Sequence, residues 1–160
     1  MHSFPVIIRE ALNSDFKQLC KLFLEENRFH AELVPEYIQT TSEVLTQEEL
    51  QTFIASSTGC LFVCEHERKL LGAVIVSLKE ERENRWKKAR LVGYIEDLVV
   101  TSTACGRGIG KRLLDEARKW VLSHGVQTIE LHVWERNVGA RSFYASLGLK
   151  DVQRRMRWNF

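Results

Sequence analysis

Three glycines at alternate positions are the clearest chemical feature of the sequence. Gly106, Gly108 and Gly110 follow the apolar run at residues 98–100 and lead into a stretch with apolar residues at helical spacing. Because glycine has no Cβ atom, backbone N–H groups at these positions can approach a ligand closely. The free N–H groups and the positive dipole end at a helix start favour an anion. This segment is therefore expected to hold a phosphate-like group at the edge of a sheet.

Two common phosphate-binding motifs do not match this segment. A P-loop needs G-x-x-x-x-G-K-[ST], but Arg112 follows Lys111 here and Cys105 stands at the first glycine position. A Rossmann fingerprint needs G-x-G-x-x-G in the first βα unit, whereas the spacing here is G-x-G-x-G and lies late in the chain. A glycine-rich turn without a ligand is the remaining alternative, although one turn rarely needs three alternating glycines.

A third motif fits better. The pattern R/Q-x-x-G-x-G/A falls on residues 105–110, and it resembles the acetyl-CoA pyrophosphate motif of the GNAT family of N-acetyltransferases. Cys105 departs from the usual Arg or Gln, which predicts weaker cofactor affinity but not its loss. Residues 134–149 resemble a second family segment, N-x-x-A-x-x-F-Y-x-x-x-G-[FL]. Both segments occur in the family's order and spacing, so the pair is more specific than either alone.

The resemblance implies which residues contact acetyl-CoA. They come from a strand end, the glycine turn and a later helix: Leu98, Val99, Val100, Cys105, Gly106, Arg107, Gly108, Ile109, Gly110, Lys111, Asn137 and Tyr144. In the family, the strands matching residues 94–100 and 128–134 splay apart, and the acyl-pantetheine arm lies between them. No metal is expected, because the four cysteines form no C-x-x-C pair and no His pair has zinc-finger spacing.

Acetyl transfer requires a base and an acid. An alkyl amine with a pKa of about 10.4 is mostly protonated at neutral pH and must lose a proton before it attacks a thioester. Glu96 is the candidate base, since the Ile-Glu-Asp-Leu run resembles that of diamine acetyltransferases; a structural salt bridge is the alternative. Tyr144 matches the family tyrosine that points at the cofactor sulfur, which makes it the candidate acid; simple packing is the alternative. Asp97 is expected to face away from Glu96, and a backbone N–H near Leu98 or Val99 is expected to stabilise the oxyanion.

The acceptor is expected to meet the first half of the chain. Residues 25–49 carry a single base, Arg28, and seven acids: Glu25, Glu26, Glu32, Glu36, Glu43, Glu48 and Glu49. An acidic mouth would favour a cationic acceptor, such as a polyamine, a lysine side chain or an aminoglycoside. A solvated helical face explains the same acids equally well. His30 and Tyr37 are further candidates for lining the cleft.

Length and composition indicate a single N-acetyltransferase domain over residues 1–160. The chain is 44% hydrophobic and 28% charged, and its net charge is +2, so neither a nucleic-acid nor a membrane partner is expected. The first ten residues lack the pattern of a signal peptide, and the protein is expected to be cytoplasmic. The expected partners are acetyl-CoA and an amine acceptor, and a homodimer is left open.

The predicted elements alternate in the order of the GNAT acyl-CoA N-acyltransferase fold. Strands are expected at 6–9, 60–65, 70–78, 94–100, 128–134 and 151–160, helices at 14–26, from 46, from 109 and at 138–147, and loops at 27–45 and 79–90. The fold class is α/β (α+β), with a mixed, mostly antiparallel central sheet and helices on both faces.

Two functions remain open at this point. The first is an acetyl-CoA-dependent N-acetyltransferase that moves an acetyl group to a primary amine by direct attack in a ternary complex. The second is a catalytically weak acyl-CoA-binding sensor or subunit with the same fold. The joint presence of Glu96, Asn137 and Tyr144 favours the enzyme, whereas Cys105 points the other way.

Overall fold

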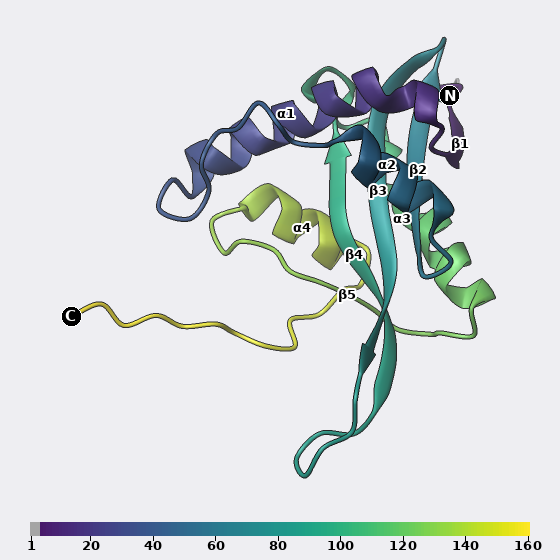
Figure 1. Ribbon diagram of the computed structural model, residues 1–160. Coiled ribbons are helices and arrows are strands. Elements are labelled where there is room, and N and C mark those ends of the chain that lie inside the picture. The colour runs from purple at the N-terminus through teal and green to yellow at the C-terminus, as the bar shows by residue number, and fades with distance from the viewer. Residues whose placement is uncertain (1–3) are drawn as a thin grey trace.

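The computed structural model describes residues 4–160 and contains one five-stranded mixed sheet (Figure 1). The strands are β1 (Ile7–Glu10), β2 (Gly59–His66), β3 (Lys69–Glu81), β4 (Arg90–Val100) and β5 (Ile129–Leu131), and they lie in this order. The pairs β1–β2, β2–β3 and β3–β4 are antiparallel, and β4–β5 is parallel. A parallel pair needs a crossover, which an α-helix supplies here. The expected mixed, mostly antiparallel sheet is confirmed.

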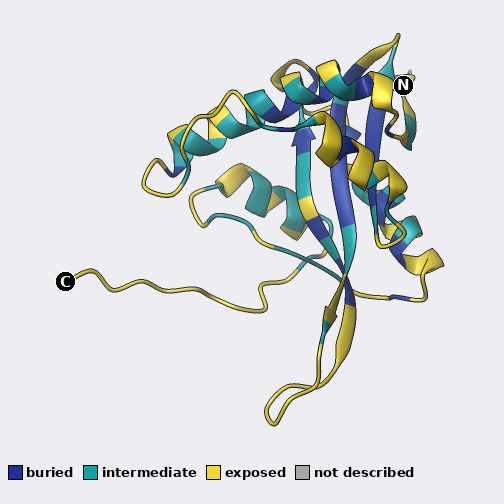
Figure 2. Ribbon diagram, in the orientation of Figure 1, coloured by how far each residue is buried: buried dark blue, intermediate teal, exposed yellow. Residues whose placement is uncertain are grey.

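Helices cover both faces of this sheet. They are α1 (Phe16–Leu33), α2 (Gln47–Ala55), α3 (Ile109–Ser123) and α4 (Val138–Ser146), with short 3-10 turns at Asn13–Asp15 and Ser102–Ala104. Successive side chains of β2 alternate between two cores: Leu61 and Val63 pack with α1 and α2, whereas Phe62 and Cys64 pack with α3. The buried residues of both cores lie mainly on the central strands of the sheet (Figure 2). No helix of residues 4–160 is long and apolar enough to cross a membrane.

The first helix is longer than predicted. It continues through residues 27–33, where the sequence pattern indicated a loop. The positions that continue its inner face, Glu26 and His30, are polar and therefore interrupt the apolar period used for the prediction.

Three further sequence predictions were wrong at the sheet margins. Residues 79–90 are not a loop throughout, because β3 extends to Glu81 and β4 begins at Arg90, where the two side chains form a 2.9 Å salt bridge. Residues 151–160 have the alternation of a strand but form none, because no neighbouring strand pairs with them. The strand predicted at 128–134 is shortened to Ile129–Leu131.

Candidate active site

A cleft of about 1260 Å³ connects the glycine turn with the inner face of α1. Strand β4 forms its floor, α1 and α2 form one wall, and α4 with the segment after β5 forms the opposite wall (Figure 1). The turn before α3 closes one end. The cleft therefore brings together the two sequence segments that resemble acetyltransferase motifs.

The glycine turn has the backbone geometry of an anion site. Gly106 and Gly108 have φ of 77° and 75°, a region that side chains disfavour, and an added Cβ at either would meet no protein atom within 4 Å. The Arg112 N–H donates to the Gly108 carbonyl across 3.1 Å, so the preceding N–H groups at 109–111 begin the helix without helical acceptors. Those N–H groups and the dipole of α3 suit a phosphate.

Gly110 has a different role from its two neighbours. An added Cβ there would lie 3.1 Å from Cζ of Phe143, a side chain of α4. The third glycine therefore allows α4 to pack closely against the start of α3, and it positions the wall of the cleft.

The two central strands separate above the turn. Strand β5 pairs with β4 only at Gly93, Tyr94 and Ile95, while β4 continues to Val100. Beyond Ile95, backbone groups of β4 that point away from β3 have no β5 partner. This opening lies where an extended amide-bearing chain could pair with β4, and it agrees with the splayed strands that the family resemblance implies.

Helix α4 carries the second sequence motif into the cleft. The Asn137 side-chain oxygen accepts a 3.1 Å hydrogen bond from the Ala140 N–H and caps the helix. Tyr144 lies two turns further along and lines the cleft. Burial, together with the charges of Asp97 and Glu26, raises the pKa of Tyr144 to about 12.

A β-bulge decides where the two carboxylates of β4 point. Ile75 pairs with Asp97 and Val76 pairs with Ile95, which leaves Glu96 without a cross-strand partner. Such an extra residue breaks the strict alternation of a strand and re-aims side chains. The prediction that Asp97 faces away from Glu96 is therefore wrong, and both residues line the cleft.

Glu96 is exposed although it lies in the central strand β4. Its carboxylate accepts a 2.7 Å hydrogen bond from Ser77 Oγ and lies 3.0 Å from Lys79 Nζ. Lys79 also lies over the ring of Tyr94, 3.4 Å from its centroid. The salt bridge considered as the alternative role is thus present, and the carboxylate is held open to the cleft.

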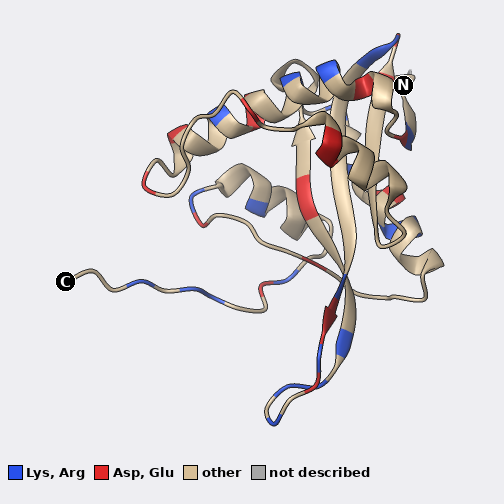
Figure 3. Cartoon of the chain, viewed as in Figure 1, with Lys and Arg blue, Asp and Glu red and all other residues tan. Residues whose placement is uncertain are grey.

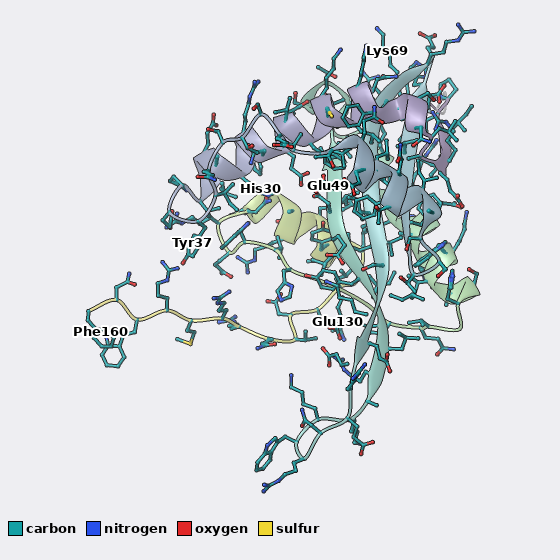
Figure 4. All side chains as sticks on the ribbon, viewed as in Figure 1. His30, Tyr37, Glu49, Lys69, Glu130 and Phe160 are labelled. Carbon is teal, nitrogen blue, oxygen red and sulfur yellow. The ribbon has the colours of Figure 1, made fainter. Side chains whose placement is uncertain are left out.

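Asp97 lies in a cluster that was not identified from the sequence. Glu26 of α1 shares a hydrogen bond with it, and burial and the neighbouring carboxylate hold the pKa of Glu26 well above its usual range. His30 lies one helical turn further, with Nδ1 3.9 Å from Glu26, on the side of α1 that faces α4 (Figure 4). Burial lowers the pKa of His30, against the opposing charge of Asp97. The i, i+4 spacing of Glu26 and His30 was the one available sequence signal.

Three of the six remaining acids of residues 25–49 have structural partners. Glu25 accepts hydrogen bonds from Thr101 Oγ1 at 3.0 Å and the Ser102 N–H at 2.6 Å, and these bonds lower its pKa against the effect of burial. Glu36 lies 2.8 Å from Arg136, and Glu49 completes the capping box of α2. The acidic character of the cleft therefore depends on fewer residues than the sequence count indicated. Within residues 4–160, no group of three or more His, Cys, Asp or Glu side chains is placed to hold a metal.

Two curated proteins of related sequence are named as N-acetyltransferases. The chain is 29% identical over 93 residues to the N-alpha-acetyltransferase MAK3 of Arabidopsis thaliana, a match covering 58% of this chain and 46% of that protein. It is 33% identical over 97 residues to an uncharacterized N-acetyltransferase of Methanocaldococcus jannaschii, covering 58% and 39%. The chain thus spans less than half the length of these curated relatives.

Solved structures and the family profile agree with this similarity. A mutant of the BH1408 protein from Bacillus halodurans superposes with a TM-score of 0.91 at 26% identity, covering 96% of this chain and 99% of that one. The aminoglycoside 6'-N-acetyltransferase AAC(6')-IG from Acinetobacter haemolyticus shares the fold, with a TM-score of 0.73 at 16% identity over 96% of this chain and 97% of that one. The profile of the acetyltransferase (GNAT) family matches residues 19–149. The chain therefore belongs to the GNAT family of acetyltransferases.

Proposed function

We propose that this protein transfers the acetyl group of acetyl-CoA to a primary amine that arrives as a cation. The acceptor is a small cationic amine or an amine of a peptide or protein. The observation that carries this proposal is that one cleft joins an anion-binding turn to Glu26, Asp97 and Tyr144. Donor and acceptor would then meet directly, in a ternary complex, without an acyl-enzyme intermediate.

The residues at the turn fit the acetyl-CoA pyrophosphate. The left-handed conformations at Gly106 and Gly108 and the free N–H groups at the start of α3 supply donors and no obstructing side chain. A fold neighbour, the aminoglycoside N-acetyltransferase AAC(6')-Iy, was solved in complex with CoA. The residues proposed for binding are those that the motif predicted, from Leu98 to Lys111 with Asn137 and Tyr144, and Cys105 at the turn makes backbone N–H groups the main ligands.

The Glu26–Asp97 pair supports a cationic acceptor. Glu26 keeps its proton because burial and the neighbouring charge of Asp97 raise its pKa and disfavour a second negative charge there. An ammonium group can replace that proton as the neutralising charge. The pair therefore attracts a charged amine at the inner end of the cleft and would select against a neutral acceptor.

Glu96 is the proposed base, and Tyr144 the proposed acid. Once the ammonium is held by Asp97, the neighbouring Glu96 accepts its proton directly or through one water, which leaves a nucleophilic amine. The amine nitrogen attacks the thioester carbonyl, and its second proton passes to solvent as the amide forms. The carbon–sulfur bond breaks, and the departing thiolate receives a hydrogen bond or a proton from the Tyr144 hydroxyl, which then regains a proton from solvent. Binding of the ammonium also neutralises the carboxylates that raise the pKa of Tyr144, so the phenol becomes a better donor when the acceptor is present.

The oxyanion would be stabilised by the backbone of β4. N–H groups near Leu98 or Val99 that lack a β5 partner are available at the opening of the two strands. The location of the protein in the cytoplasm remains a prediction from the sequence.

A panel of amines tests the proposal. Purified protein is incubated with acetyl-CoA and with cationic or neutral amines, and free thiol release is followed. Cationic primary amines should give saturable turnover, with initial-velocity lines that intersect as a ternary complex requires. Acetyl-CoA binding by calorimetry with no turnover above the uncatalysed rate for any amine would favour the sensor or subunit instead.

A further inference from the structure

Strands β3 and β4 continue beyond the rest of the sheet as a two-stranded hairpin. Strand β2 accompanies β3 only as far as Ser77, and β5 pairs with β4 only from Gly93 onward. Within the described chain, residues 79–92 therefore pair as strands only with each other, and the hairpin projects from one end of the molecule (Figure 1). Every residue from 82 to 90 is exposed, and none of them lines the cleft.

The turn at the tip of this hairpin has a defined backbone. The Asn84 side-chain oxygen accepts hydrogen bonds from the N–H groups of Trp86 and Lys87 at 2.8 and 2.9 Å. The Asn84 N–H donates to the Lys87 carbonyl at 3.0 Å. Nearer the sheet, Arg90 forms a 2.9 Å salt bridge with Glu81. The side chains at the tip are therefore presented by a turn that its own hydrogen bonds fix.

The tip is strongly basic, although the chain as a whole has a net charge of only +2. Residues 82–88 contain one acid and four bases, which are Arg82, Arg85, Lys87 and Lys88 (Figure 3). Among residues 4–160, no carboxylate lies within 4 Å of any of these four bases, whereas Lys79 and Arg90 below the tip are both paired with acids. The four charges at the tip are therefore available to an anionic partner.

One aromatic ring stands among these charges. Trp86 is 83% exposed, and it is the one apolar side chain of residues 82–88. The Arg85 guanidinium lies over its ring, 4.9 Å from the centroid. An exposed indole ring and a guanidinium both offer flat surfaces on which a nucleic-acid base can stack.

We propose that the hairpin tip, defined as residues 82–88, binds single-stranded nucleic acid, with its four bases on phosphates and an unpaired nucleobase stacked on Trp86. Each part of this ligand has a counterpart at the tip, because phosphates attract the cations and the nucleobase covers the ring. An acidic polypeptide would pair with the cations but would supply no flat ring for Trp86. An anionic membrane is held by several apolar side chains together, and the tip has one. This binding goes beyond the proposed acetyl transfer and does not depend on it.

Fluorescence anisotropy of a labelled strand of about 12 nucleotides tests the proposal. Wild-type protein at about 50 mM salt should bind oligothymidylate or oligouridylate saturably, and log K should fall with log salt at a slope of roughly −2.8 for four phosphate contacts. The arm that binds more tightly identifies DNA or RNA as the source of the ligand. Trp86→Ala should weaken binding about tenfold, as expected for one lost stacking contact, and Trp86→Phe should retain most of the affinity.

A pair of double variants tests the role of the charges. Lys87→Gln with Lys88→Gln removes two bases from the tip, so the salt slope should become shallower by about 1.4. The matched control, Lys17→Gln with Lys21→Gln, removes two exposed bases from α1 and should bind with the affinity and the salt slope of the wild type. Circular dichroism should show the wild-type thermal midpoint for every variant, so that a loss of binding is not a loss of folding.

Four results would overturn the proposal. The first is that neither strand binds at about 50 mM salt, where electrostatic binding is strong. The second is full affinity in Trp86→Ala, and the third is an equal loss in the α1 control. The fourth is equal competition by polyglutamate of the same charge, or binding to phosphatidylserine vesicles without binding to either strand, because the partner would then be an acidic polypeptide or a membrane.

Discussion

At the scale of single residues, the hydroxyl of Tyr144 is the group on which the leaving thiolate depends in this mechanism. Tyr144→Phe removes only that hydroxyl and keeps the ring that lines the cleft. We expect kcat to fall by roughly 10²-fold, the usual scale for a positioned acid, with acetyl-CoA affinity unchanged. Tyr37→Phe removes a hydroxyl from an exposed ring in the turn after α1, which is not among the residues that line the cleft, and is the matched control. Equal rates for Tyr144→Phe and wild type would leave Tyr144 as a packing residue.

Kinetics should distinguish the roles of Glu96 and Asp97, the two carboxylates at the β4 bulge. Glu96→Gln should lower kcat/KM, and the defect should shrink as the pH approaches the amine pKa of about 10.4, because more amine is then already neutral. Asp97→Asn should chiefly raise KM for a cationic amine and spare KM for acetyl-CoA. A pH-independent defect in Glu96→Gln would make Glu96 a positioning carboxylate that is fixed by Ser77 and Lys79.

Glu26 links the site to the stability of the fold. Its pKa is raised in the folded state, so the folded protein binds this proton more tightly than the unfolded chain, whose Glu pKa is about 4.3. The corresponding stability is fully present below pH 4.3 and is lost as the pH rises through the folded pKa. The Gln side chain of Glu26→Gln cannot ionise. Between pH 5 and pH 9, the free energy of unfolding of this variant should therefore rise relative to that of the wild type by more than about 1 kcal/mol.

Urea unfolding at several pH values measures this difference. Glu32→Gln changes an exposed residue of the same helix and should show no such pH-dependent gain. If the difference in free energy of unfolding between Glu26→Gln and wild type stays constant with pH, Glu26 is ionised in the folded protein. That result would contradict a protonated Glu26 beside Asp97.

At the scale of elements, alanine substitutions at two glycines that flank α3 should distinguish the effect of backbone strain from the effect of ligand binding. Gly108→Ala and Gly125→Ala place a Cβ at φ of 75° in both cases, and neither Cβ would meet a protein atom within 4 Å. Each should lower the free energy of unfolding by about 1–2 kcal/mol. Only Gly108→Ala should also weaken acetyl-CoA binding in calorimetry, because Gly125 ends α3 at the opposite pole of the helix. Unchanged acetyl-CoA affinity in Gly108→Ala would place the pyrophosphate elsewhere.

The elements that carry the motifs could be predicted from the sequence because their signals are local. The strand, glycine turn and helix around Gly108 follow from apolar periodicity and glycine spacing, and the cap at Asn137 follows from residue type. The β4 bulge could not be predicted, since it arises from the register with β3, and it reversed the expected direction of Asp97. The Glu26–Asp97 contact joins residues from separate elements and needs the fold. The strand prediction for residues 151–160 was wrong for another reason. These residues have the alternation of a strand but form none, because no strand pairs with them.

At the scale of the whole molecule, charge is unevenly distributed although the net charge is only +2. Bases lie along residues 151–160 and the β3–β4 hairpin, whereas acids occupy β4 and α2 beside the cleft (Figure 3). A cationic acceptor is therefore attracted to the side of the molecule where the carboxylates lie. This arrangement predicts that added salt raises KM for a cationic amine more than for a neutral one, because exposed charges are screened within about 10 Å at 0.1 M ionic strength.

Mass spectrometry of the acceptor after incubation with acetyl-CoA tests the central claim most directly, because it detects transfer to nitrogen and not merely loss of the thioester. A cationic primary amine should be recovered as its N-acetyl derivative in amounts that match the thiol released. The yield at fixed time should fall sharply in Tyr144→Phe and in Asp97→Asn. Thiol release without an acetylated amine, or equal yields from wild type and both variants, would contradict the assignment of acetyl transfer to this cleft.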